Sequence, residues 1–243
     1  MDITDIKGAN VRKILDVLRF SSGMVKREIA SDTGLSFSTV SNVCNALEDL
    51  HILYETKSGD TTVGRTPDKF HFNSGGYCSL CVERPQEDIL RISALDFANK
   101  LLFQTELPLT ADDDAMSLSN YIQQVYEDLA HSQGFSGIEF VGVGLSVSGG
   151  QGHKNRQLTN GLHSNFDNTS LEELIRQRTG LPCYTESQAN LCVVSVSQAG
   201  HDSENILYLH SSTILSVGVI CEGNLLRGRN GNAADIAHCL LYT

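Results

Sequence analysis

The sequence predicts an α/β chain that begins with a small winged helix-turn-helix and continues into a larger α/β domain. Apolar residues in the first 50 positions recur at helical spacing. Two short apolar runs then flank a stretch rich in turn residues, as in a β-hairpin. Beyond the Ser/Gly-rich junction Asn73–Gly76, strand-like and helix-like segments alternate. We therefore expect a domain over residues 1–73 and a second over 77–243.

Charge is distributed unevenly along the 243 residues, whose net charge is −11. Residues 1–73 hold nine Lys and Arg against ten Asp and Glu, whereas residues 74–243 hold nine against nineteen. The acidic part would repel nucleic acid and confine contact to the N-terminal part. The N-terminus has no signal-peptide core, and no apolar run is long enough for a membrane span. These features predict a cytoplasmic protein.

Seven cysteines are scattered through the sequence, mostly in apolar segments. This distribution indicates buried thiols in a reducing compartment rather than disulfides. Cys78 and Cys81 form a C-x-x-C, but it lies in a strand-like run and has no second pair. We expect no metal site there.

The first predicted helix covers Asn10 to Phe20. Its residues Val11, Ile14, Leu15 and Leu18 follow the i, i+3, i+4, i+7 pattern of a helix with one buried face. That face would pack on the two helices that follow.

The next two predicted helices form the centre of the N-terminal domain. The first runs from about Val25 to Asp32 and ends at Thr33-Gly34, because glycine accepts the positive φ of a helix end. Ser36 is a candidate cap for the second helix. The second helix would bury one face and expose another, with Val40, Val43, Leu47 and Leu50 inside and Ser38, Thr39, Ser41, Asn42 and Asn45 outside.

The exposed side chains of the second helix are short groups that both donate and accept hydrogen bonds, as base edges in a major groove require. The candidate DNA-binding residues of this helix pair are Lys26, Arg27, Ser36, Ser38, Thr39 and Asn42. Lys26 and Arg27 suit phosphate contacts, and Ser38, Thr39 and Asn42 suit bases. The alternative is a helical hairpin whose polar face meets only solvent.

A predicted hairpin completes the N-terminal domain, with strands at Ile52–Tyr54 and Phe70–Phe72. Its tip carries Gly64-Arg65-Thr66-Pro67, in which proline would stiffen the loop. An arginine presented in this way can enter a narrow minor groove, so Arg65 is a further candidate DNA contact. The alternative for Arg65 is a solvated turn residue.

The second domain is predicted to alternate strands and helices, with an early hairpin turning at Asn99-Lys100. Ligands in such folds bind at the carboxyl ends of the strands. The expected strands cover residues 77–82, 90–95, 101–107, 140–147, 183–185, 206–210, 215–221 and 224–226, and the expected helices cover 118–130, 171–179 and 188–198.

The chain resembles transcriptional regulators of the ROK family (repressors, open reading frames and sugar kinases). The matching motifs are N-x-R-x-I-L at 10–15, GRTP at 64–67, GVGLSVSGG at 142–150, TESQAN at 185–190 and GNLLRGRNGNAADIAH at 223–238. The resemblance implies an actin-like sugar kinase domain behind the winged helix. It also implies double-stranded DNA as partner, a sugar or sugar-phosphate effector, and a homodimer or higher homo-oligomer.

Departures from the kinase members of the family predict that this chain is not an enzyme. The first phosphate loop of kinases corresponds to ERPQED at 83–88, which is expected to be a bulky acidic loop without glycine. The general-base Asp corresponds to Gln188, whose amide cannot accept the proton. The second phosphate loop corresponds to 212–216, again without glycines.

The resemblance implies an effector site made by Gly149, Ser187, Gln188, Asp235 and His238. Asp235 stands where family members use Glu to hold sugar hydroxyls, so the contact would shift. The His joins a zinc site in many members, but the cysteine cluster is missing here, so His238 is expected to be a packed histidine without metal. The domain would comprise a first lobe at about 77–200 and a partial second lobe at about 201–243, since family members are longer.

These features together predict a sequence-specific DNA-binding transcriptional regulator, a repressor of carbohydrate-related genes, with no kinase activity and no cofactor. Two alternatives stay open. One is a sugar kinase with an appended winged helix, and the other is a winged-helix module that contacts protein.

Overall fold

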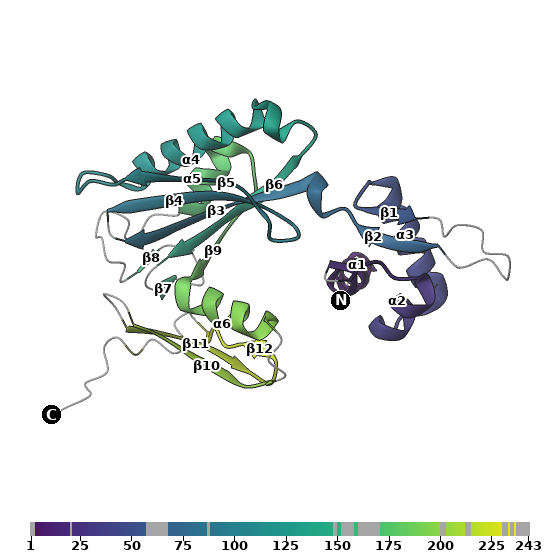
Figure 1. Cartoon of the computed structure of the whole chain (residues 1–243). Coiled ribbons are helices and arrows are strands. Elements are labelled where there is room, and N and C mark those ends of the chain that lie inside the picture. Colours follow the sequence, from purple (N-terminus) through teal and green to yellow (C-terminus); the bar gives the residue numbers. More distant parts are fainter. Residues whose placement is uncertain are drawn as a thin grey trace. The chain divides into compact units, whose positions relative to one another are not determined.

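The computed structural model of the chain contains two compact units (Figure 1). The first comprises residues 1–78 with the segments 95–102 and 137–139, and the second comprises the remainder. Within both units the structure describes residues 3–19, 21–56, 68–86, 88–147, 150–151, 158–159, 171–199, 203–211, 215–229, 233 and 236. Among these residues, no helix has the length and apolar character that crossing a membrane requires.

The first unit contains three helices followed by two antiparallel strands. The elements are α1 (Ile3–Arg19), α2 (Lys26–Thr33), α3 (Phe37–Asp49), β1 (Leu53–Thr56) and β2 (Lys69–Phe72). This is the element order predicted from the sequence. Helix α1 starts at Ile3, before the predicted Asn10. Residues 3–9 have no continuous apolar stripe, so the sequence pattern did not indicate that they are helical.

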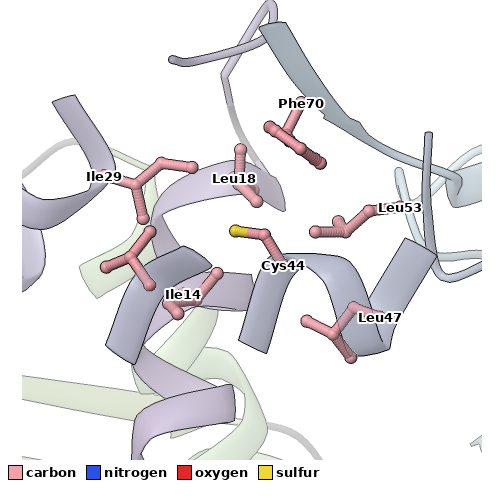
Figure 2. Packing of buried hydrophobic residues seen from close by; sticks show 8 residues of the cluster. Ile14, Leu18, Ile29, Cys44, Leu47, Leu53 and Phe70 are labelled. Carbon is pink, nitrogen blue, oxygen red and sulfur yellow. The ribbon is translucent and has the colours of Figure 1, made fainter. Parts of the chain in front are cut away.

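Side chains from all five elements form the core of this unit (Figure 2). The fully or nearly fully buried members are Ile14, Leu18, Ile29, Val40, Cys44, Leu47, Leu53 and Phe70. The predicted inward faces of α1 and α3 are thus confirmed except at one position. Leu50 was expected inside but is 62% exposed, because α3 ends at Asp49 and Leu50 is the residue that follows.

Two further connections tie the first unit together. The backbone N–H groups of Met24 and Phe70 each donate to the other residue's carbonyl, at 3.0 and 2.9 Å, so the segment before α2 pairs with β2. Arg19 donates from Nε to the Phe97 carbonyl and from a terminal nitrogen to Asn99 Oδ1, each at 3.0 Å. The Phe97 ring stacks on Phe72. The 95–102 turn is therefore held against α1 and β2.

The second unit is built on a five-stranded sheet with the strand order β5-β4-β3-β6-β9. Its strands are β3 (Tyr77–Gln86), β4 (Ile89–Asp96), β5 (Leu101–Pro108), β6 (Glu139–Val147) and β9 (Cys183–Ser187). Strands β3, β4 and β5 follow one another through short connections, whereas β6 and β9 run parallel. Helices α4 (Ala115–Ala130) and α5 (Leu171–Thr179) cover one face of this mixed sheet (Figure 1).

A smaller sheet follows in the chain and packs against α6 (Gln188–Gln198). It contains β10 (Ile206–Ser211), β11 (Leu215–Cys221) and β12 (Asn224–Leu225) in antiparallel order. Gly218 of β11 allows the close approach, since a Cβ there would lie 2.2 Å from the Ala189 carbonyl oxygen. The other short elements are β7 (Gly150–Gln151), β8 (Leu158–Thr159) and the 3₁₀ turns η1 (Ser74–Gly76) and η2 (Gln133–Phe135).

One sequence prediction in the sheet is wrong. The segment Glu83–Gln86 was expected to be a loop but continues strand β3. Arg91 of β4 explains its stability there, because its guanidinium bridges Glu83 of β3 at 2.9 Å and Glu106 of β5 at 2.8 Å. Glu83, which belongs to the segment expected to be a loop, is therefore part of a cross-strand ion pair with arginine.

Candidate functional site

Helices α2 and α3 are joined by a tight turn whose residues have the predicted roles. Gly34 follows α2 with φ of 67°, the left-handed conformation that ends the helix. Ser36 then caps α3, because its Oγ accepts a hydrogen bond from the Thr39 N–H at 3.2 Å. The hydroxyls of Ser38 and Thr39 lie 2.9 and 2.8 Å from the same oxygen. The first turn of α3 is thus fixed by a cluster of hydroxyl groups.

Helix α3 has an inward apolar face and an outward polar face. Val40, Cys44 and Leu47 are buried, whereas Ser38 and Asn42 are exposed and Thr39 is half-buried. One turn of helix separates Ser38 from Asn42, so both side chains leave the same side of α3. This face presents hydroxyl and amide groups to solvent, where they are able to meet another polar molecule.

Lys26, the first residue of α2, points toward α3. Its Nζ donates to Asn45 Oδ1 at 2.9 Å and to Ser41 Oγ at 3.3 Å, and it lies 4.8 Å from the centre of the Phe70 ring. The sequence assigned Ser41 and Asn45 to the outer face but did not reveal this bond, since the residues are 15 and 19 positions apart from Lys26. Lys26 therefore links the start of α2 to α3.

The next cation, Arg27, is exposed in the first turn of α2. Glu28 beside it accepts a hydrogen bond from the Val25 N–H at 3.0 Å and so closes the start of the helix. Arg27 thus offers a guanidinium next to the α2–α3 pair. Arg65, the candidate minor-groove residue, lies outside the described residues.

A second group of candidate residues lies at the carboxyl ends of β6 and β9. These parallel strands are in register, with Val147 opposite Ser187, so their ends meet at one edge of the sheet. Ser187 and Gln188 follow this edge into α6. Such an edge is where α/β folds bind ligands. Gly149, Asp235 and His238, the other predicted effector residues, lie outside the described residues.

Ser187 caps α6 in the same way that Ser36 caps α3, with its Oγ accepting from the Asn190 N–H at 3.3 Å. Its hydroxyl proton is still able to donate to a ligand. Gln188 is half-buried as the first residue of α6. Both side chains can hydrogen-bond a polyol, and the Gln188 amide has no proton-accepting chemistry near neutral pH.

Sequence reasoning missed a set of contacts around Glu186 at this edge. One carboxylate oxygen accepts from Asn190 Nδ2 at 2.8 Å and from the Ser187 N–H at 3.0 Å, while the other accepts from Arg227 Nε at 2.8 Å. Glu186 and Asn190 both belong to the TESQAN segment, so their contact could have been predicted from that motif. Arg227 is 41 positions away, and no local pattern connects it to Glu186.

No group of three or more potential metal ligands occurs among the residues that the structure describes. Cys78 and Cys81 are three positions apart in β3, so their side chains leave opposite faces of the sheet and cannot share one ion. Burial raises the pKa of the Cys78 thiol to about 11, with the Asp96 carboxylate adding to the effect. The C-x-x-C is accordingly a pair of strand residues with separate surroundings.

The ROK family model matches residues 87–242, more than half of the chain and most of the second unit. The chain belongs to the ROK family. The xylose repressor of Bacillus spizizenii is 25% identical over 243 residues, which cover 98% of this chain and 62% of that protein. The glucokinase of Halalkalibacterium halodurans is 21% identical over 151 residues, covering 61% of this chain and 46% of the kinase. The chain thus spans less than two thirds of these ROK relatives.

Solved ROK structures share the fold. A ROK transcriptional regulator described as a homolog of the E. coli MLC protein superposes with a TM-score of 0.79 at 18% identity, over 94% of this chain and 58% of the regulator. A ROK glucokinase from Streptomyces griseus, in complex with glucose and AMPPNP, superposes with a TM-score of 0.56 at 20% identity. That match covers 68% of this chain and 51% of the kinase.

Proposed function

We propose that this ROK protein is a cytoplasmic, DNA-binding transcriptional repressor of carbohydrate-related genes that responds to a sugar or sugar phosphate and lacks kinase activity. The observation that carries the proposal is the exposed polar face of α3, fixed by the Ser36 cap behind the Gly34 turn. On this proposal residues 1–73 are a winged helix-turn-helix, α3 is the recognition helix, and the segment between β1 and β2 is the wing.

The chemistry of α3 supports DNA as the partner. Ser38 and Asn42 offer donors and acceptors of the kind that base edges match in a major groove. Thr39 and Ser36 lie beside Ser38 in the hydroxyl cluster and would add further hydroxyl groups for contacts with the duplex. Arg27 supplies a nearby exposed cation for a phosphate, and Arg65 would enter the minor groove from the wing.

The extent of the similarity supports a regulator over a kinase. The xylose repressor of Bacillus spizizenii matches 98% of this chain, which includes the N-terminal helices. The glucokinase of Halalkalibacterium halodurans matches 61%. A chain that shared only a catalytic body with its relatives would match kinases and repressors over equal lengths.

The second unit supports a binding role without phosphoryl transfer. Strand β3 continues through Glu83–Gln86 to a short turn, where the resemblance to kinases calls for a glycine-rich phosphate loop. Gln188 occupies the position that the same resemblance assigns to the general base. Ser187 and Gln188 would hydrogen-bond sugar hydroxyls, together with Gly149, Asp235 and His238. Effector occupancy at this edge would then alter DNA affinity.

Recognition by one copy would be weak, because α3 carries no Lys or Arg. Two copies on a repeated half-site would multiply the phosphate contacts and supply the missing affinity. We therefore propose a homodimer or higher homo-oligomer as the DNA-binding form.

Selection of duplexes from a randomised library by the full chain tests the proposal. We expect one enriched sequence, and a binding constant that falls steeply with added salt as counterions are released. Replacing both Ser38 and Asn42 by alanine should weaken binding to that duplex by about 1–3 kcal/mol for each base that these side chains recognise. Gln124→Ala, on the exposed surface of α4, is the matched control. Failure to enrich any duplex at low salt would refute the function.

A further inference from the structure

Phe37 is an exposed aromatic residue at the first position of α3. Its side chain is 54% exposed, and it does not belong to the core cluster of the first unit. A single exposed aromatic side chain is common on protein surfaces, so exposure alone decides nothing. The position of Phe37 is more informative than its exposure. Phe37 stands between the exposed hydroxyl residues Ser36 and Ser38 at the start of the proposed recognition helix.

The contacts of Lys26 show which neighbours of Phe37 on α3 are already bonded within the protein. Successive residues of an α-helix are rotated by about 100°, so Phe37, Ser41 and Asn45 lie along one edge of α3. Lys26 holds both Ser41 and Asn45 through hydrogen bonds. Phe37 belongs to the same edge, one turn before Ser41, in the N-terminal turn of α3. Residues of the N-terminal turn are those that reach base edges when a recognition helix enters the major groove.

We propose that Phe37 is a specificity residue that recognises thymine through its C5-methyl group. This inference rests on the proposed DNA-binding function. The phenyl ring can neither donate to nor accept from a polar base edge, so contact with one would leave that edge unsatisfied. The thymine methyl is the apolar group of the major-groove edge, and an apolar side chain such as Phe suits it. A base step containing thymine would therefore be preferred opposite Phe37.

The test removes the methyl group from the DNA and the ring from the protein. The full chain first selects a duplex from a randomised library, and each dT of that duplex is then replaced singly by dU, which differs by the methyl alone. We expect one or two positions where dU weakens binding by about fourfold, the factor that corresponds to about 0.8 kcal/mol for one buried methyl or methylene group. In Phe37→Ala, dT and dU should bind equally at those positions.

Tyr54→Ala is the matched control, since Tyr54 is also an exposed aromatic residue of the first unit, at 49%. It should keep the dT/dU ratio of the unchanged protein. A purely structural role for Phe37 would lower binding to both duplexes and leave their ratio intact, which would overturn the inference while the proposed function stands. A chain that selects no duplex at all would overturn both.

Discussion

Lys26 Nζ lies 2.9 Å from Asn45 Oδ1, so the first residue of α2 is joined to the third turn of α3. The same ammonium lies over the Phe70 ring of β2. One side chain thus spans three elements of the first unit. Its hydrogen bonds to Ser41 and Asn45 engage the ammonium within the first unit.

Lys26 and Arg27 are neighbours with separable roles, which two substitutions can distinguish. Lys26→Met removes both hydrogen bonds to α3 and should lower the free energy of unfolding by about 1 kcal/mol, because a partly exposed pair contributes modestly. Arg27→Met should leave stability unchanged and reduce the slope of log binding constant against log salt by about one phosphate contact. Denaturant titration and salt-dependent binding measure the two effects. Equal loss of stability in both variants would contradict the assignment.

Arg65→Ala tests the proposed wing contact. We expect operator affinity to fall by about 1–3 kcal/mol, the cost of losing an arginine that reads bases. Fluorescence anisotropy with a selected duplex measures it. Arg12→Ala is the control, since the Arg12 side chain is 85% exposed on α1 and its ion pair with Asp16 is long at 3.9 Å. If the two variants bind equally well, Arg65 is a solvated turn residue.

Gly218→Ala should destabilise the second unit. The new methyl group would lie 2.2 Å from the Ala189 carbonyl oxygen and 2.9 Å from Val193 Cγ1, so α6 would have to move away from β11. Overpacking of this kind costs about 1–3 kcal/mol. Thermal or denaturant unfolding followed by circular dichroism should report the loss. Gly144→Ala in β6 is the matched control, because its nearest neighbour is 3.9 Å away, and an equal loss there would contradict the packing argument.

Cys44 should make the stability of the first unit depend on alkaline pH. Burial raises the pKa of its thiol from 9.0 to about 11, with Lys26 opposing and Glu48 adding to the effect. The unfolded thiol therefore loses its proton first, so the contribution of the neutral buried thiol is complete below pH 9 and declines as pH rises toward 11. The stability difference between the unchanged protein and Cys44→Ala should shrink over that range. A stability difference that stays constant would show that unfolding does not change the pKa of this thiol.

Phosphoryl transfer by this chain should be undetectable, and restoring a general base at position 188 should not produce it. Gln188→Asp supplies a carboxylate at the start of α6, but β3 remains a strand through Gln86, and the sequence 83–88 contains no glycine that would let phosphate approach the backbone. We expect no sugar-dependent ATP consumption by either protein in a coupled assay with a panel of hexoses and pentoses. Turnover by the unchanged chain would support the kinase alternative.

Local patterns in the sequence predicted most of the fold. The spacing of Ile14 and Leu18 indicated the inward face of α1, and Gly34 with Ser36 marked the turn between α2 and α3. Helix α5 and helix α6 have the predicted bounds. Glu83–Gln86 misled because its polar residues suggest a loop, while the cross-strand pairing with Arg91 that stabilises a strand is not visible locally.

The candidate sites were harder to predict, because their geometry comes from distant contacts. The residue type of Lys26 suggests a phosphate ligand. Its contact with Ser41 depends on how α2 and α3 pack, which the sequence does not show. Along the chain, α6 and the strands β10, β11 and β12 lie between Glu186 and Arg227, so their contact depends on how these elements pack. Residue types indicated which atoms could bind, but the folded chain decides which of those atoms are already bonded internally.

The division of α3 into two faces makes it a good subject for engineering. A combinatorial library that randomises Phe37, Ser38 and Asn42 would vary the chemistry of the outer surface while Val40, Cys44 and Leu47 hold the scaffold. Under the proposed DNA-binding function, such a library should yield mostly folded clones with altered base preferences. Target choice could then be redesigned without repairing the protein each time.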